Sequence, residues 1–131
     1  MNRLKITVDD RDRRPIYVQI VEGVKELIAR GDLGEGAALP PVRQLAADLG
    51  VNMNTVAGAY RELQKMGLLD VRHGSGAVVA SRQGVASTRA KGDLRKTLRI
   101  ALAGMVLAGM GRAEIEGLVD SELRELAMSK D

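Results

Sequence analysis

The sequence of 131 residues contains no cysteine, no phenylalanine and no tryptophan, and its single histidine is His73. Without cysteine the chain has no disulfide, no thiolate metal ligand and no cysteine nucleophile. One histidine also excludes a metal cluster built on several histidines, and no pair of carboxylates converges in the pattern. We therefore expect neither an enzyme nor a bound metal or other cofactor.

The lack of large aromatic side chains limits the core that this chain can build. Hydrophobic residues make up 45% of the sequence and charged residues 28%, which is typical of a soluble globular protein. A core of Leu, Val, Ile, Ala and Met is thin, and oligomerisation commonly supplements such a core. The charged N-terminal segment has no apolar stretch of the kind found in signal peptides, so we expect a cytoplasmic protein.

The cations are distributed unevenly, although the net charge is only +3. Residues 82–99 contain one acid, Asp93, and six cations, which are Arg82, Arg89, Lys91, Arg95, Lys96 and Arg99. Such a run fits an anionic partner, and it fits a solvated linker equally well.

Apolar residues at helical spacing predict two helices in the first 50 residues. The first runs over residues 15–28, with Pro15 in the first turn, Asp12 available as a cap and Gly31 as the stop. The second spans residues 42–49 and ends at Gly50, which is free to take a positive φ. The alternating piece 5–8 before them is expected to be an extended arm.

A third helix and a hairpin complete the N-terminal half. Asn52 is expected to cap a helix that runs to about residue 66. Strands over residues 68–72 and 77–80 follow, and the two glycines between them, Gly74 and Gly76, favour a hairpin. This order predicts a winged helix-turn-helix, a mainly α fold with a small β-hairpin that binds DNA.

The C-terminal part is predicted to be a linker followed by two helices. Residues 82–92 have the small, polar and basic composition of a linker. Asp93 can cap a helix over residues 94–110, whose second half is apolar all round, too short to span a bilayer and better suited to burial on several sides. A second helix follows over residues 113–128. The expected domains are thus a winged helix-turn-helix (1–81), a basic linker (82–92) and a two-helix dimerisation domain (93–131).

Two helices of this size cannot bury a core alone, so we expect them to pack on the same pair from a second copy. An effector pocket could then exist only between subunits, and whether a small molecule binds stays open. The expected dimerisation residues are Leu98, Leu102, Met105, Val106, Ile115, Leu118, Val119 and Leu123.

The candidates for DNA contact lie at the start of the second and third helices. Arg43 can clamp a phosphate or reach a guanine edge with its two-pronged guanidinium, and its alternative is a solvated side chain. Asn54 can pair with an adenine edge and Thr55 can offer its hydroxyl to a base or phosphate. Asn52 fits contact and plain capping equally well.

The outward face of the third helix carries Met53, Ala57 and Arg61, the first two being unusual surface residues unless something covers them. Tyr60 could reach a phosphate, but its inward spacing favours the core. The hairpin tip offers cations beside glycines whose backbone N–H groups can approach phosphate, or it is merely a tight turn. The expected DNA-binding residues are Arg43, Asn52, Met53, Asn54, Thr55, Arg61, Arg72, His73 and Gly74.

Residues 15–80 carry a series of short motifs: Pro15-Ile16-Tyr17-x-Gln19-Ile20, Gly31-Asp32-Leu33-x-x-Gly36, Leu39-Pro40-x-x-Arg43-x-Leu45-Ala46, Asn52-x-Asn54-Thr55-Val56-x-x-Ala59-Tyr60-x-x-Leu63, Gly67-Leu68 and His73-Gly74-x-Gly76. Together they resemble the GntR family of bacterial transcription regulators. The resemblance implies that Arg43, the start of the third helix and the hairpin tip bind operator DNA as a symmetric dimer. Many members have arginines where this chain has Met53 and Ala57, which puts base recognition at those two positions in doubt.

The short tail resembles the YtrA type, since the MocR type carries a large pyridoxal-phosphate-binding domain that about 50 residues cannot supply. The expected function is a sequence-specific transcription regulator, by family habit a repressor, that binds a palindromic operator as a homodimer. The alternative is a winged-helix module for protein–protein assembly without sequence-specific DNA binding.

Overall fold

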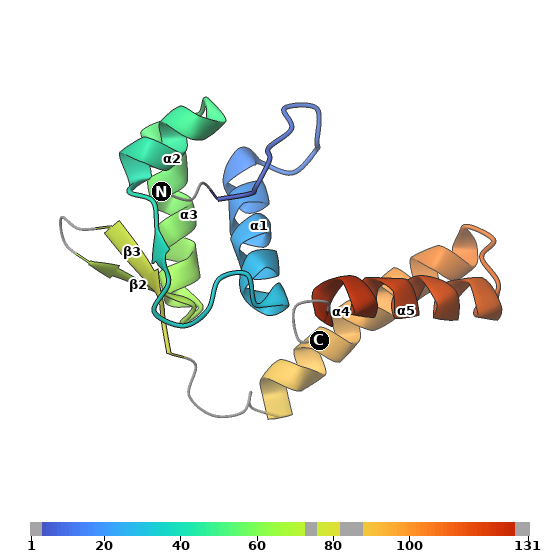
Figure 1. Ribbon diagram of the computed structural model, residues 1–131. Helices are drawn as coiled ribbons and strands as arrows, with labels where there is room; N and C mark the ends of the chain where they lie inside the picture. Colours follow the sequence, from blue (N-terminus) through green and yellow to red (C-terminus); the bar gives the residue numbers. More distant parts are fainter. Residues whose placement is uncertain (1–3, 73–75, 82–87, 128–131) are drawn as a thin grey trace. The chain divides into compact units, whose positions relative to one another are not determined.

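The computed structural model describes residues 4–72, 76–81 and 88–127, which form two compact units divided near residue 82. The N-terminal unit holds three helices and a small sheet, and the C-terminal unit holds two helices (Figure 1). The elements of the first are α1 (Ile16–Arg30), β1 (Ala38–Leu39), α2 (Val42–Leu49), α3 (Met53–Lys65), β2 (Leu69–Arg72) and β3 (Gly76–Val79). Those of the second are α4 (Thr88–Leu107) and α5 (Arg112–Ala127). The expected fold class, a mainly α winged helix-turn-helix with a two-helix tail, is confirmed.

Helix α1 stops at Gly31, as expected, but Pro15 is its N-cap rather than a residue of its first turn, and the helix continues to Arg30. Gly31 takes a φ of 87° as the C-cap, and its N–H donates to the Ile28 carbonyl oxygen. Asp12, in contrast, does not cap this helix. Its carboxylate accepts from the Arg14 N–H at 2.9 Å and pairs with the Arg14 guanidinium at 2.8 Å. The side-chain hydrogen bond from Arg14 lowers the pKa of Asp12 to about 2.

Helices α2 and α3 are joined by a three-residue turn, and the expected bounds are confirmed. Gly50 closes α2 with a φ of 68°, a left-handed conformation that favours glycine. Asn52 caps α3, because its side-chain oxygen accepts from the Asn54 N–H at 2.7 Å.

The sheet has three antiparallel strands in the order β1-β3-β2. Strand β3 pairs with β2 through Leu69↔Val79 and with β1 through Leu39↔Ala77. The hairpin strands begin within one residue of the expected positions. The two-residue strand β1 was missed, since so short a segment has no alternation and becomes a strand only by pairing with β3.

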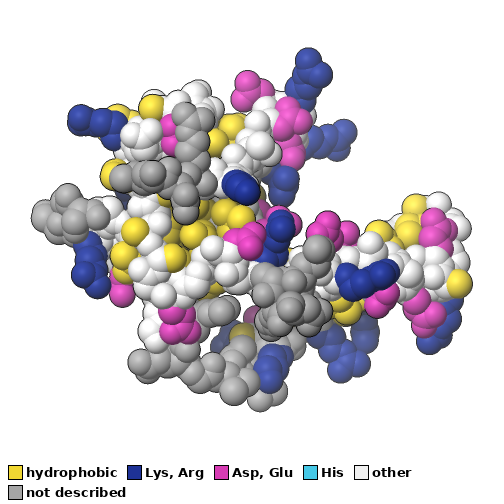
Figure 2. Space-filling model, viewed as in Figure 1, with side chains coloured by type: hydrophobic (Ala, Val, Ile, Leu, Met, Phe, Trp, Pro, Cys, Tyr) yellow, Lys and Arg dark blue, Asp and Glu magenta, His cyan; other side chains and the backbone are white. Residues whose placement is uncertain are grey.

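Helix α3 lies at the centre of the N-terminal unit and contacts α1, α2 and β2. Figure 2 shows hydrophobic atoms gathered in the middle of this unit, with charged side chains around them. The largest fully buried side chains are Ile20, Val24, Leu45, Val56, Tyr60, Leu63 and Leu69. A single aromatic ring, Tyr60, thus serves an otherwise aliphatic core, as the composition predicts.

The N-terminal arm packs across α1. Ile6 is buried against Gly23, where an added Cβ would lie 2.7 Å from the Ile6 Cγ2 atom. The buried Gln19 side chain accepts from the Asp9 N–H at 2.7 Å and donates to the carbonyl oxygens of Asp9 and Arg14, each at 3.0 Å. Leu4 and Val8 also pack against the core, so the arm is held by several apolar contacts as well as by the hydrogen bonds of Gln19.

The C-terminal unit differs from expectation at the start of α4. The helix begins at Thr88, so residues 88–92 are helical rather than part of a linker, and Asp93 lies inside the helix instead of capping it. Arg89, Ala90 and Lys91 are good helix formers, and one glycine among them costs only about 1 kcal/mol. Residues 82–87, the rest of the expected linker, lie outside the described residues.

The two helices are joined by a short loop in which Gly109 has a φ of 90°, and α4 ends at Leu107, before the expected residue 110. No helix in the described part of the chain is long and apolar enough to cross a membrane.

Candidate nucleic-acid interface

The start of α2 carries Arg43 on the outside of the fold. Leu45 and Ala46 face the core, which leaves Arg43 and Gln44 exposed in the first turn. In the part of the chain that the structure describes, Arg43 makes no ion pair. Its guanidinium is therefore available to an anion. The partial positive charge at the start of α2 also attracts anions.

The first turn of α3 presents Asn54 to solvent and leaves Thr55 half-buried beneath it. The side chain of Asn52 is used in the cap, which bears out the capping interpretation. Because the Asn52 side-chain oxygen accepts from the Asn54 N–H, the side-chain NH₂ group is the part of Asn52 that stays free to donate.

The outward face of α3 contains Met53, Ala57 and Arg61, as the spacing predicts. Met53 is 47% exposed, Arg61 is exposed and Ala57 is half-buried. An added Cβ at Gly58 would lie 3.8 Å from Arg61 Nη2, so the guanidinium lies back toward the N-terminal half of the helix. This placement brings a cation nearer to the asparagine-rich end than its sequence position suggests.

A hollow of about 550 Å³ lies between the first turns of α1 and α3. It is lined by Pro15, Ile16, Tyr17, Asn54, Thr55 and Gly58. Tyr17, 45% exposed, was not among the expected site residues. No local pattern marks Tyr17 as a surface contact, and only the packing of α1 on α3 shows that it borders the same surface as Asn54.

Tyr60 is fully buried in the core, as its inward spacing predicts. Its hydroxyl donates to the Pro40 carbonyl oxygen at 2.6 Å. Burial raises the pKa of this phenol well above its ordinary value, so Tyr60 stays neutral. It supports the site by position rather than by contact with an anion.

The base of the hairpin lies close to the start of α2. Gly76 has a φ of +83°, and an added Cβ there would lie 3.7 Å from the Leu39 carbonyl oxygen and 3.9 Å from the Pro41 Cα atom. Arg72 pairs with Gly76 across the ladder and is exposed. His73 and Gly74, also expected at the site, lie outside the described residues.

The C-terminal unit contains an apolar groove of about 750 Å³ between α4 and α5. Six of the eight expected dimerisation residues line it, namely Leu98, Leu102, Val106, Ile115, Val119 and Leu123. Met105, half-buried, and Leu118, exposed, are not among its lining residues. Over residues 89–126 no side chain is fully buried, so these helices bury no core within one chain.

The apolar half of α4 was expected to be buried on several sides, and within this single chain it is not. Ile100 and Leu107 are 75% and 88% exposed. Two helices have one contact line between them, and the other sides of α4 need a further element to cover them.

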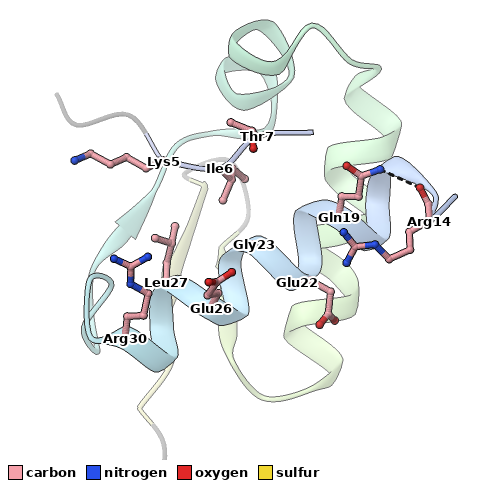
Figure 3. A pocket seen from close by; sticks show the side chains of 10 residues that line it. All are labelled: Lys5, Ile6, Thr7, Arg14, Gln19, Glu22, Gly23, Glu26, Leu27 and Arg30. Carbon is pink, nitrogen blue, oxygen red and sulfur yellow. Dashed lines mark hydrogen bonds between the residues drawn. The ribbon is translucent and has the colours of Figure 1, made fainter. Parts of the chain in front are cut away.

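A smaller cavity of about 330 Å³ lies where the arm crosses α1 (Figure 3). Its charged lining residues are Lys5, Arg14, Glu22, Glu26 and Arg30. Three cations and two anions line it, and this mixture of signs does not form a cradle for phosphate.

The sequence of the N-terminal unit matches a family model described as bacterial regulatory proteins, gntR family, over residues 16–79. The structure is also similar to YtrA from Sulfolobus acidocaldarius, a GntR-family transcription factor. That likeness has a TM-score of 0.62 and 40% identity, and it covers 75% of this chain and 97% of the other. The chain belongs to the GntR family.

This GntR-family chain is also similar to one further protein in sequence and to one further solved structure. The HTH-type transcriptional repressor YtrA of Bacillus subtilis is 40% identical over 75 residues, which are 57% of this chain and 58% of the relative. The chain thus matches little more than half of that protein's length. A solved structure titled transcriptional antiterminator, from Listeria monocytogenes EGD-e, has a TM-score of 0.86 at 29% identity and covers 95% of this chain and 94% of that one. The expected resemblance to the YtrA type is confirmed.

Proposed function

We propose that this GntR-family chain is a sequence-specific DNA-binding transcription regulator. The observation that carries the proposal is that α3 is buried along one face and exposed along the other. Its inner face, including Val56, Tyr60 and Leu63, is fully buried, while Asn54 and Arg61 project outward. A helix held in this way can enter the major groove and present its first turn to base edges.

Arg43 and Asn54 are proposed to carry most of the direct base or phosphate recognition. The fork-shaped guanidinium of Arg43 suits a guanine edge or a phosphate, and the Asn54 amide suits adenine. Asn52, held in its cap, and Thr55 act at the same turn as supporting contacts. Met53 is exposed on the outward face of α3, where it can cover the methyl group of a thymine.

The hollow next to Asn54 extends the proposed contact surface to α1. The Tyr17 hydroxyl and the first backbone N–H groups of α1 are groups that hold phosphates in DNA complexes. At the hairpin, Arg72 is proposed to contact the neighbouring backbone, together with His73 and Gly74.

The apolar groove between α4 and α5 is proposed to take the same helices of a second chain. Groove residues recur at intervals of four on α4 (Leu98, Leu102, Val106) and on α5 (Ile115, Val119, Leu123), the pattern of a helix-bundle seam. A two-fold dimer made in this way would place two recognition helices on a palindromic operator. The repressor named YtrA supports repression as the outcome. The proposed division of labour is a DNA-binding unit followed by a dimerisation unit, divided near residue 82.

Selection of binding sequences from random duplex DNA tests the function, because the operator need not be known in advance. Enrichment of a two-fold-symmetric sequence is expected. No enriched sequence from a well-folded protein would favour the assembly module instead.

The selected duplex then allows a matched pair of variants. Arg43→Ala should lose about 1–3 kcal/mol of binding free energy. Arg30→Ala removes an arginine that pairs with Asp32 at 3.5 Å at the far end of α1, and it should bind normally. Full affinity of the Arg43 variant would contradict its assigned role.

A further inference from the structure

The first three turns of α4 form a face of five cations that the winged helix does not account for. The face consists of Arg89, Lys91, Arg95, Lys96 and Arg99, all of them exposed. Asp93 is the one acid among residues 88–99. From residue 100 to the end of α4 there is no charged residue, so the helix divides into a basic half and an apolar half.

Three of these cations form a stripe that is separate from the dimer groove. Arg89, Lys96 and Arg99 stand at positions i, i+7 and i+10, which lie on one side of a helix. None of the three lines the groove between α4 and α5. A second chain that fills the groove therefore leaves this stripe accessible.

The charges of this face are not neutralised within the chain. In the residues that the structure describes, none of the five cations makes an ion pair, whereas on α5 Arg112 pairs with Glu116 at 3.2 Å and Arg124 with Asp120 at 3.0 Å. Figure 2 shows blue side chains over the C-terminal unit as well as the N-terminal one. The uncompensated charge favours an anionic partner.

The geometry favours an extended polyanion over a small anion or a membrane. Ten residues of helix separate Arg89 from Arg99, which is about 15 Å at 1.5 Å per residue. Duplex DNA presents one charge about every 1.7 Å along its axis, so it can face the whole stripe, whereas one small anion meets one or two cations. A membrane-surface helix needs a continuous row of large apolar side chains opposite its cations, and here that side carries Leu94, Leu98 and the cation Lys91. Leu98 lines the groove between α4 and α5, so Leu94 is the one large apolar side chain left for a membrane on this side.

We infer that the basic face of α4 binds the phosphate backbone of the same duplex that the winged helix reads. Seven peptide units join Ser81 to Thr88, and they span at most about 25 Å. The start of the face is thus tethered within about one helical turn of DNA from the end of the hairpin unit, which gives a duplex bound there a high effective concentration at the face. The inference rests on the proposed function and adds a sequence-independent contact to it.

The triple variant Arg89→Gln/Lys96→Gln/Arg99→Gln tests the inference in the full chain. Glutamine keeps helix propensity while it removes charge. The affinities for the selected duplex and for an unrelated duplex are measured by fluorescence anisotropy across a salt series. Each lost phosphate contact should make the slope of log K against log salt shallower by about 0.9. Both duplexes should weaken by the same factor, because backbone contacts carry no sequence information.

Two controls separate charge from structure. Arg124→Gln removes a cation that is already paired with Asp120 and should leave the slope unchanged. Arg89→Lys/Arg99→Lys keeps the charges and should retain the wild-type slope, since a lysine meets a phosphate as a point charge. Circular dichroism and sedimentation should show the same fold and oligomeric state for all variants.

Failure of the inference is distinguishable from failure of the proposed function. A wild-type protein that binds its selected duplex, with an unchanged slope in the triple variant, would overturn the inference alone. Binding of the wild type to no duplex at all would overturn both. Loss of binding to anionic vesicles, with an unchanged DNA slope, would assign the face to a membrane instead.

Discussion

The Tyr60 hydroxyl donates a hydrogen bond over 2.6 Å to the carbonyl oxygen of Pro40. This bond joins the middle of α3 to the segment that leads into α2, three residues before Arg43. The two helices that carry the candidate DNA contacts, α2 and α3, are therefore linked by a hydrogen bond on the core side, away from the exposed contact residues. This hydrogen bond helps to fix the orientation of α3 relative to the start of α2.

Tyr60→Phe keeps the ring but removes this bond, and it should lower the free energy of unfolding by about 0.5–1.5 kcal/mol. Thermal denaturation near neutral pH checks the loss. The difference also has a pH dependence, since the pKa of Tyr60 is higher in the folded chain than in the unfolded one, where it is about 10. The stability associated with the neutral phenol is present below that value and is lost as the pH rises above it. The variant should lack this alkaline loss, and equal pH profiles would contradict the assignment.

Gln19→Leu should release the N-terminal arm from α1. The substitution removes one acceptor and one donor group that serve the backbone of Asp9 and Arg14, and it should cost about 1–3 kcal/mol. Faster amide hydrogen exchange at Asp9 would report the release directly. Gln44→Leu is the matched control, because Gln44 is exposed and, among the described residues, its side chain bonds to Asp48 alone. An unchanged exchange rate at Asp9 would show that the apolar contacts of Leu4, Ile6 and Val8 hold the arm without Gln19.

Gly23→Ala should destabilise the N-terminal unit by about 1–3 kcal/mol, although alanine favours helices, because its Cβ would lie 2.7 Å from Ile6 Cγ2. The penalty should shrink in an Ile6→Ala background, which a double-mutant cycle measures by chemical denaturation. Gly117→Ala on α5 is the control, since nothing lies within 4 Å of its added Cβ and it faces away from the groove-lining Ile115. Additive effects of the Ile6 and Gly23 substitutions would contradict the proposed clash.

Val119→Glu should dissociate the proposed dimer, because it places a charge among the apolar residues of the α4–α5 groove. Sedimentation equilibrium should show a monomer at concentrations where the wild type is a dimer. Ser121→Glu changes an exposed polar residue of α5 that does not line the groove, and it should leave the dimer intact. A Val119 variant that stays dimeric would place the interface elsewhere.

The sequence predicts the N-terminal unit well, because its helices carry local signals. Gly31 and Gly50 end α1 and α2, and Asn52 caps α3, as the cap rules require. Strand β1 and the buried role of Gln19 depend on contacts between distant residues, and no local pattern encodes them. The predicted start of α4 is too late because residues 88–92 combine the small, polar composition of a linker with good helix formers. In the structure the helix propensity decides, and these residues are helical.

The residues of the candidate site also fall into two groups, those that local sequence patterns predict and those that depend on packing between elements. Spacing identified Arg43, Asn54 and Arg61 as exposed positions, because each lies opposite a buried face on its own helix. Tyr17 was missed because its position beside Asn54 arises from the packing of α1 on α3. The backward lean of Arg61 over Gly58 likewise depends on a side-chain rotamer that sequence spacing does not specify.

The ratio of dissociation constants for the selected duplex and a shuffled duplex of equal length tests the central claim most directly. Both should be measured at one physiological salt concentration, because backbone binding alone changes strongly with salt. A regulator that reads base edges should bind the selected duplex about 10³–10⁷ times more tightly. A ratio close to one would contradict sequence-specific recognition by this chain.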